Sequence, residues 1–290
     1  MRVTPLHPHI GARAEGVDLR SPLTAELRAA IEAAMDRHAV LVFPGQDLDD
    51  DQQMAFGAAF GPIERTPATV DAQKRRLKHA QMNDISNLDA NGEILKADDR
   101  RRMFNLGNRL WHSDSSFKNT PSKYSLLHAR SIPPEGGETE FADMRAAWDA
   151  LSEEQKAALD GLVALHDVFW SRGQIGFTEF PPGEREQFPP SRQRLVRRHP
   201  GSGRKGLYLS AHASHILGWP VPEGRLLLAD LTEHATRRAF VYSHRWREGD
   251  LVIWDNRDTM HRGRPHDERF PRDLRRATTL DTGSTLDEAA

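Results

Sequence analysis

The sequence contains no cysteine in 290 residues. Without thiols the chain has no disulfide framework, no thiolate metal site and no cysteine nucleophile. Any transition metal must therefore be held by histidine and carboxylate side chains. The chain supplies both, with 14 histidines and 42 acidic residues.

An excess of positive charge is also missing, since the formal net charge is −2 at pH 7. Proteins that bind nucleic acids or anionic membranes carry a marked basic excess, so we expect neither partner. No uninterrupted apolar run approaches the length of a membrane span, and residues 1–9 lack the apolar core of a signal peptide. We therefore expect a cytoplasmic protein.

Capping residues and apolar periodicity predict several helices. Thr24 is a candidate N-cap for a helix through about His38, and Asp49 with Gln52 forms a capping-box pattern for a second helix that stops at Gly61. Further helices are expected after Asp143, after Ser152 and over residues 223–235. Short apolar runs predict strands at 39–43, 123–130, 139–142, 239–242 and 250–254, and a strand, turn and strand over 195–209.

Two long segments, residues 64–102 and 171–191, are polar or rich in glycine and proline and show no regular period. Loops of this length are usually functional or mobile, so we expect pocket walls or a lid, with a surface excursion as the alternative for the first. No repeat or linker divides the chain, which predicts a single domain over residues 1–290. Many short strands framed by a few helices favour a mainly β sandwich or jelly roll.

His112 and Asp114 stand two residues apart in an otherwise uncharged stretch, residues 110–116. In a β-strand, residues i and i+2 point to the same face, so both side chains would reach one ion. His261, downstream of the strand expected at 250–254, is the candidate third ligand. Two histidines and one carboxylate form the facial triad that leaves three positions open at non-heme Fe(II).

Chance is the alternative to this metal site. At this composition His-x-Asp/Glu is expected roughly twice, and it occurs twice. The second instance, residues 266–268, lies in a run of charges and prolines that is typical of a solvated turn, whereas His112 follows the apolar pair 110–111. Two other features have a simpler interpretation. The basic residues within 195–209 are typical of a solvated turn more than of a phosphate site, and His234 of a packed or surface histidine.

Several segments together resemble a known family. They are residues 110–116, 133–147, 201–205, 210–215, 254–257, 260–263 and 274–281. The chain resembles the TauD/TfdA Fe(II)- and 2-oxoglutarate-dependent dioxygenases, and within them the branch typified by 2,4-dichlorophenoxyacetate (aryloxyalkanoate) dioxygenase. The resemblance covers nearly the whole chain and implies a mainly β fold with flanking helices around a double-stranded β-helix, or jelly-roll, core.

The resemblance also implies roles for individual residues. His112, Asp114 and His261 correspond to the family's iron ligands. The cofactors implied are Fe(II), 2-oxoglutarate as cosubstrate and O2.

Four further residues correspond to binding positions of the family. The resemblance implies that Arg272 and Thr139 hold the distal carboxylate of 2-oxoglutarate, that Arg276 binds the acid group of the substrate, and that Asn108 lines the pocket. A planar guanidinium suits a carboxylate because it donates two parallel hydrogen bonds. The alternative for the arginines is a solvated basic segment, since four of them crowd residues 269–276.

The implied reaction is hydroxylation of an aryloxyalkanoate next to its ether oxygen, which gives a phenol and an oxo-acid together with succinate and CO2. The implied partner is a small carboxylate, and the family suggests a homo-oligomer. Three alternatives remain at this point. They are a taurine-type sulfonate dioxygenase, a dioxygenase for another small carboxylate, and a metal-binding jelly roll without oxidative activity, such as a sensor or hydrolase.

Overall fold

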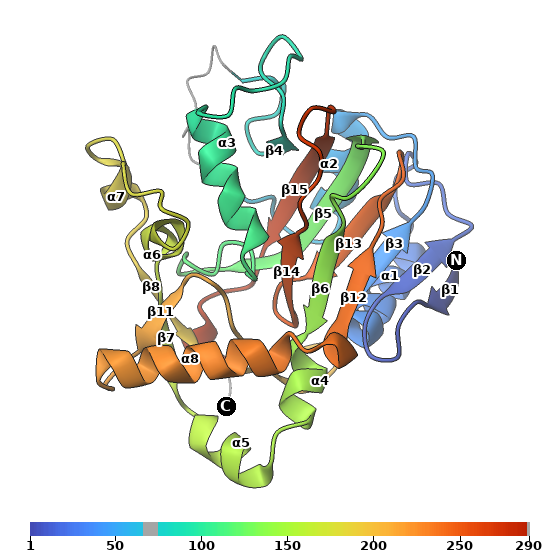
Figure 1. Ribbon diagram of the computed structural model, residues 1–290. Helices are drawn as coiled ribbons and strands as arrows, with labels where there is room; N and C mark the ends of the chain where they lie inside the picture. Colours follow the sequence, from blue (N-terminus) through green and yellow to red (C-terminus); the bar gives the residue numbers. More distant parts are fainter. Residues whose placement is uncertain (66–74, 289–290) are drawn as a thin grey trace.

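A seven-stranded sheet runs through the computed structural model, which describes residues 1–65 and 75–288 (Figure 1). All of its neighbouring strands are antiparallel except β2 and β3, which are parallel. Across the sheet the strands are β1 (Arg2–Pro5), β2 (Ala12–Glu15), β3 (Val40–Phe43), β13 (Leu251–Asp255), β5 (Ser122–Ser131), β15 (Asp273–Leu280) and β4 (Asn83–Ser86).

A three-stranded sheet packs on one face of the large one. Its order is β12 (Val241–His244), β6 (Thr139–Asp143) and β14 (Thr259–Gly263). In Figure 1 these strands lie in front of β5, β13 and β15. Phe141 of β6 shares an apolar cluster with Leu127, Trp254 and Leu274 of the large sheet. The two sheets thus enclose a common core, because alternate residues of each strand point inward.

Helices cover the other face of the large sheet and frame its ends. Ile31 and Met35 of the first helix and Phe56 of the second pack in one cluster with Leu41 and Phe43 of β3. The helices are α1 (Ala25–His38), α2 (Asp50–Ala58), α3 (Arg100–Asn105), α4 (Met144–Asp149), α5 (Glu153–Leu159), α6 (Val168–Gly173), α7 (Glu184–Gln187) and α8 (Val221–Ala235). Short 3-10 helices are η2 (Leu106–Arg109), η3 (Arg238–Phe240) and η4 (Thr285–Asp287).

A third apolar cluster joins α4, α5 and α8 to the remaining strands. These strands form a three-stranded sheet, β11 (Ala213–Ile216), β7 (Val163–His166) and β8 (Ser191–Arg194), and a hairpin of β9 (Val196–Arg198) and β10 (Lys205–Leu207). In Figure 1 this region occupies the lower left, beside the front sheet. No helix within residues 1–65 and 75–288 has both the length and the apolar character needed to cross a membrane.

The helix caps predicted from the sequence are confirmed. Thr24 accepts a hydrogen bond from the amide of Leu27, and capping boxes join Asp49 to Gln52 and Ser152 to Gln155. These caps work because a short polar side chain satisfies an amide that has no partner within the first helical turn. The sheet-rich architecture with flanking helices also agrees with the expected fold class.

Three local predictions are wrong. Residues 239–240 belong to η3, and the expected strand begins only at Val241. Residues 64–102 are not wholly irregular, since β4 completes the edge of the large sheet and α3 begins at Arg100. Residues 171–191 likewise contain the end of α6 and all of α7. In each case pairing or packing against distant residues overrides a weak local pattern. The part of the first segment at 66–74 lies outside the described residues.

Candidate active site

His112, Asp114 and His261 lie together in the structure, and all three are buried. His261 lies on β14, and the backbones of His112 and His261 exchange two hydrogen bonds of 3.0 and 2.8 Å. The Nε2 atoms of the two histidines are 3.8 and 3.7 Å from the carboxylate oxygens of Asp114. Three ligand atoms at these separations can surround one metal ion.

The strand expected at residues 112–114 is not present. His112 forms only an isolated bridge with His261, and Asp114 opens a turn in which Ser115 has a positive φ of 51°. Ser113, between the two ligands, donates through its hydroxyl to the carbonyl of Thr259 at 2.8 Å. The side chains of His112 and Asp114 are therefore brought together by a bridge followed by a turn. They do not meet through the i, i+2 spacing of a strand.

His112 presents a free nitrogen to the centre of the group. Nδ1 of His112 lies 2.8 Å from the carbonyl of Leu110, to which it can only donate, so its Nε2 carries the lone pair. Burial lowers the pKa of His112, and burial followed by repulsion from His112 lowers that of His261. Two neutral imidazoles result, which is the form that binds a divalent metal.

Asp114 stays ionised in this buried place. Burial alone would raise its pKa, but the positive charge of Arg276 and the hydrogen bond from Ser125 outweigh that effect and hold the pKa at about 2. Nη1 of Arg276 donates to Oδ1 at 2.5 Å, and the Ser125 hydroxyl donates to Oδ2 at 2.7 Å. The side-chain oxygen of Asn256 accepts a hydrogen bond of 3.0 Å from the backbone amide of Asp114. These contacts orient the carboxylate toward the histidines.

Two cavities meet at His112. The larger, of about 290 Å³, is lined by Asp114 and by both apolar and charged side chains of the segments 75–104 and 168–188. The smaller, of about 120 Å³, reaches past Trp254 and His261 to Thr139 and Arg272. Asn108 and Arg276 line both cavities.

Arg272 lies half-buried at the end of the smaller cavity without a carboxylate partner among the described residues. It donates a long hydrogen bond of 3.3 Å to the carbonyl of Gly137. Burial, and then repulsion from Arg109, lowers its pKa to about 10. Nearby, the Thr139 hydroxyl accepts a hydrogen bond from Trp246, so its own hydrogen remains free to donate. This end of the cavity is prepared to receive an anion.

Comparison with known proteins identifies the family at this point. Residues 2–278 match the family described as taurine catabolism dioxygenase TauD, TfdA family. The chain is 50% identical to the alpha-ketoglutarate-dependent 2,4-dichlorophenoxyacetate dioxygenase of Cupriavidus pinatubonensis, over 96% of each chain.

The chain belongs to the TauD/TfdA family.

A more distant relative and a solved structure extend the comparison. The (S)-phenoxypropionate/alpha-ketoglutarate-dioxygenase of Delftia acidovorans is 34% identical over 94% of this chain and 92% of its own. The crystal structure of AAD-2 in complex with Mn(II) and N-oxalylglycine has a TM-score of 0.91 and 51% identity, and the match covers 98% of this chain and 100% of that chain. The likeness to the TauD/TfdA family therefore extends over the whole fold.

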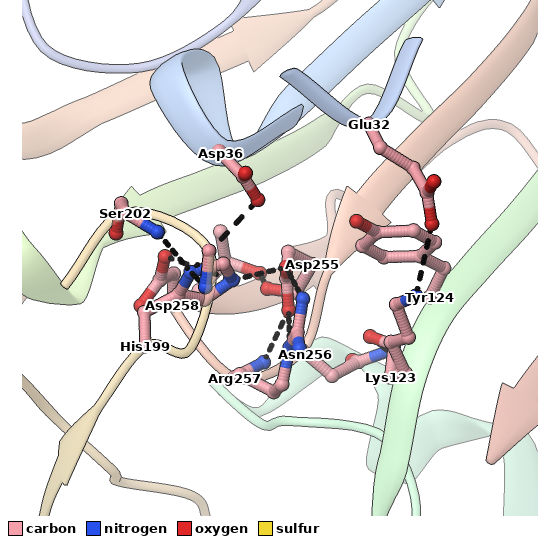
Figure 2. Close-up of polar contacts among 12 residues, drawn as sticks. Glu32, Asp36, Lys123, Tyr124, His199, Ser202, Asp255, Asn256, Arg257 and Asp258 are labelled. Carbon is pink, nitrogen blue, oxygen red and sulfur yellow. Dashed lines mark hydrogen bonds and ion pairs between the residues drawn. The ribbon is translucent and has the colours of Figure 1, made fainter. Parts of the chain in front are cut away.

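A second cluster of histidine and aspartate side chains, the residue types that bind metals, lies outside the two cavities. Figure 2 shows His199 beside Asp255 and Asp258, with Arg257 and Asp36 around them. Nε2 of His199 is 2.9 Å from Asp255, and Arg257 grips the same carboxylate through Nε and Nη2 at 2.8 and 2.6 Å. Every charge here except that of Asp36 is deeply buried.

The hydrogen bonds of His199 argue against a metal in that second group. Its Nδ1 accepts from the amides of Gly201 at 3.2 Å and Ser202 at 3.0 Å, so Nδ1 has no proton of its own. A neutral imidazole must then carry its hydrogen on Nε2, where it donates to Asp255. We interpret this group as an internal ion network that holds the 199–202 turn against the 255–258 turn.

The remaining predicted features are accounted for locally. Arg204 and Lys205 pair with Asp149 and Asp160, which favours a solvated turn over a phosphate site. The solvated interpretation is wrong for Arg197, which is buried and paired with Asp281 and Glu288. His234 contacts the carbonyl of Ala147 at 2.8 Å, as expected for a packed histidine. His266 is half-buried beside Arg272 and lines the smaller cavity, so the interpretation of residues 266–268 as a solvated turn is wrong for that residue.

Sequence reasoning missed three residues that contact the site. Ser125 and Asn256 hold Asp114, and Arg172 lines the larger cavity. Ser125 carried no signal, because its neighbours form an ordinary buried strand. Asn256 followed the predicted strand at 250–254, so a polar residue just past a buried strand could have drawn attention to it. Arg172 is one of two arginines in a segment, residues 171–191, whose pattern indicated only a loop.

Proposed function

We propose that this chain is an Fe(II)- and 2-oxoglutarate-dependent dioxygenase that hydroxylates an aryloxyalkanoate, such as 2,4-dichlorophenoxyacetate, next to its ether oxygen. One observation carries the proposal. A buried group of two neutral histidines and one ionised aspartate opens on a cavity that ends at Arg272, a half-buried cation without a carboxylate partner among the described residues. The activities named for the relatives agree with this substrate class.

His112, Asp114 and His261 would hold the iron. The donor set fits, because Nε2 of each histidine faces the carboxylate, the contact with the Leu110 carbonyl leaves Nε2 of His112 unprotonated, and the Ser125 hydroxyl orients the carboxylate. When bound, iron, 2-oxoglutarate and O2 would supply the oxidant that removes hydrogen from the substrate, with release of succinate and CO2. Hydroxylation beside the ether oxygen gives a hemiacetal, which collapses to a phenol and an oxo-acid.

Arg272 and Thr139 would hold the distal carboxylate of 2-oxoglutarate. Arg272 offers a planar fork of donors, and the free hydrogen of Thr139 adds another. The smaller cavity leads from these residues to His112 and His261, so a short dicarboxylate would extend toward the metal group. Burial strengthens these interactions, because little water competes for the donors.

The substrate would occupy the larger cavity. Arg276 and Asn108 line it where it meets the smaller one, so Arg276 would contribute to binding the acid group and Asn108 to positioning. Apolar residues such as Leu77, Met82 and Phe117 line the same space and would exclude water from the reacting bond. The residues described from 75–102 and 171–191 thus contribute to the pocket wall.

Four broader predictions accompany this function. They are a jelly-roll core, a single domain over residues 1–290, a homo-oligomeric state and a cytoplasmic location. The sandwich of β5, β13 and β15 with β6, β12 and β14 supports the jelly roll. The other three stay predictions from the sequence.

The test begins with anaerobic addition of Fe(II) and then 2-oxoglutarate to the purified chain. A weak visible charge-transfer band is expected, because the keto acid would bind the metal through two atoms. Succinate release is then measured with phenoxyacetate, phenoxypropionates, cinnamate-like acids and taurine. Release that depends on the aryloxy acids supports the proposal. Dependence on taurine alone would favour a sulfonate dioxygenase, and absence of the band would contradict a dioxygenase of any kind.

A further inference from the structure

Arg172 of α6 carries a buried charge into the larger cavity. Only 7% of the residue is exposed. Its guanidinium lies over the ring of Phe104, with 4.2 Å between Cζ and the ring centroid, and Nη1 donates to the hydroxyl of Ser171 at 3.3 Å. Its Nε has no hydrogen-bond partner in the part of the chain that the structure describes. A buried donor without a partner is costly, which points to a ligand that satisfies it.

The backbone beside Arg172 leaves room for this side chain. Gly107 of η2 lies so close that a Cβ atom there would stand 2.2 Å from Nη1 of Arg172. Glycine at this position therefore permits the guanidinium to lie flat between η2 and the cavity. Phe104 and Gly107 together fix the plane of the guanidinium, so its donors are oriented before any ligand arrives.

Several other cations around the same cavity are already neutralised by carboxylates. Arg76 pairs with Asp84 and Asp273, Arg100 with Glu184, and Lys118 with Glu64. Arg276 pairs with Asp114. Arg172 has no carboxylate within 4.0 Å among residues 1–65 and 75–288, and burial together with Arg276 lowers its pKa to about 10. The positive charge of its guanidinium is therefore available to an anionic ligand inside the cavity.

The walls around Arg172 define the rest of that ligand. Phe117, Phe188 and Val168 line the cavity beside Arg172, and His112 lines it on the side of the metal group. A ligand that fills this space has an apolar or aromatic body and one anionic end. An aryloxyalkanoate has this form.

We propose that Arg172 binds the carboxylate of the aryloxyalkanoate substrate and is its principal anchor, with Arg276 as a secondary contact. The inference rests on the proposed function and deepens it. Nε of Arg276 is without a partner among the described residues, as in Arg172, but Nη1 of Arg276 is committed to Asp114, so fewer of its donors are available to the substrate. Arg172 holds the acid group between the aromatic wall and the metal group, which sets the position of the carbon next to the ether oxygen.

The test compares a charged ligand with an uncharged one of the same shape. Phenoxyacetate and 2-phenoxyethanol are titrated into protein loaded with Mn(II) and 2-oxoglutarate, and binding is measured by calorimetry. In Arg172→Met the apolar volume is kept and the charge is lost, so phenoxyacetate should bind about 10- to 100-fold more weakly. Binding of 2-phenoxyethanol should change by less than about threefold, and Arg172→Lys should recover part of the loss.

A matched control and a second variant guard against a folding defect. Arg225→Met removes a guanidinium that stacks on Trp170, 4.1 Å from the ring centroid, but does not line the cavity, so it should bind both ligands normally. Gly107→Ala displaces the guanidinium of Arg172 without removing its charge, because Gly107 has no left-handed φ and only the tip of a flexible side chain must move. It should weaken phenoxyacetate selectively as well.

The outcomes separate this inference from the proposed function. If the unmodified protein binds phenoxyacetate and releases succinate with it, while Arg172→Met and Gly107→Ala bind it normally, the anchor is elsewhere and the inference is wrong. Equal weakening of both ligands in Arg172→Met would assign Arg172 a packing role and also contradict the inference. If the unmodified protein neither binds nor oxidises aryloxy acids, the proposed function itself fails.

Discussion

The groups around His112 and His199 use the same kinds of side chain and are buried to the same degree, but their surroundings differ. Each holds histidine and aspartate atoms within 4.8 Å of one another. Around His112 two cavities meet, and the unprotonated Nε2 faces the carboxylate. Around His199 the carboxylate of Asp255 is already held by Arg257 and by a protonated Nε2.

The comparison shows that ligand types and proximity do not define a metal site. The position of one hydrogen on each imidazole distinguishes the groups, and it is set by the backbone. A carbonyl opposite Nδ1 frees Nε2 in His112, whereas two amides opposite Nδ1 keep Nε2 protonated in His199. The two groups are also neighbours in the chain, since Asp255 serves the second and Asn256 the first.

The largest expected effect is on iron. His112→Ala, Asp114→Ala and His261→Ala should each abolish turnover and weaken Fe(II) binding by more than about 100-fold, beyond what loss of an outer contact causes. His199→Ala is the matched control from the second group. It should keep one Fe(II) per chain and lose about 1–3 kcal/mol of stability, because Asp255 loses a buried partner.

Anaerobic Fe(II) titration and urea unfolding of the four variants check this contrast. Full activity in any of the first three would mean that another histidine serves as ligand. Loss of Fe(II) in His199→Ala with an intact fold would show that the second group also holds metal.

Arg272 and Arg276 provide the next contrast, between an arginine without a carboxylate partner among the described residues and one that is paired. Arg272→Leu should raise the apparent requirement for 2-oxoglutarate by about one and a half to three and a half decades, the range for removing one partner of a buried charge pair. Arg276→Leu should leave that requirement nearly unchanged, weaken the carboxylate substrate and consume 2-oxoglutarate without making phenol. The dependence of succinate release on 2-oxoglutarate, with phenol measured in parallel, tests both. An equal loss of 2-oxoglutarate binding in the two variants would contradict this division of roles.

A smaller effect is expected from Ser125, whose hydroxyl orients Asp114. Ser125→Ala should lower Fe(II) affinity by about 10- to 100-fold, the range found for outer contacts of metal ligands. Ser122→Ala, at the start of the same strand, removes a weaker bond of 3.5 Å to Glu64 and should leave Fe(II) affinity unchanged. Calorimetric titration of Fe(II) under anaerobic conditions compares them. Equal affinities for both variants and the unmodified protein would show that Ser125 does not position the ligand.

Local signals made much of the fold predictable. The caps at Thr24, Asp49 and Ser152 depend only on residues within one helical turn, and buried strands such as β5 and β13 are short apolar runs. The edge strand β4 was not predictable, because its residues form a strand only through pairing with β15. A sequence pattern contains no information about a partner nearly 200 residues away.

The candidate site was predictable as a set of residues more than as a geometry. The resemblance pointed to His112, Asp114 and His261, and the structure brings them together, although by a turn and not by a strand. Arg172 was not predictable, because its importance depends on the absence of a nearby carboxylate. Whether a carboxylate lies near Arg172 depends on how the cavity is packed, and the spacing of residues along the chain does not show it.

The last prediction concerns Asp258, the carboxylate of the second group that has an oxygen without a hydrogen-bond partner among the described residues. Burial raises its pKa from 3.8 to about 6, although Arg145 at 3.4 Å opposes the rise. The folded state therefore binds more protons than the unfolded state between about pH 4 and pH 6, and the free energy of unfolding should fall as pH rises through that window.

Asp258→Asn removes this titration and keeps the shape of the side chain. Urea unfolding should show the variant and the unmodified protein alike below about pH 4, and the variant favoured by about 1–3 kcal/mol above pH 6, since one pKa unit is worth about 1.4 kcal/mol. Fe(II) affinity should not change, because the group around His112 does not include this carboxylate. A variant less stable than the unmodified protein at pH 7 would mean that Asp258 is an ionised partner of Arg145. The group around His199 would then be stabilised by this charge pair. It would differ from the group around His112 only in its access to a cavity and in which imidazole nitrogen carries the hydrogen.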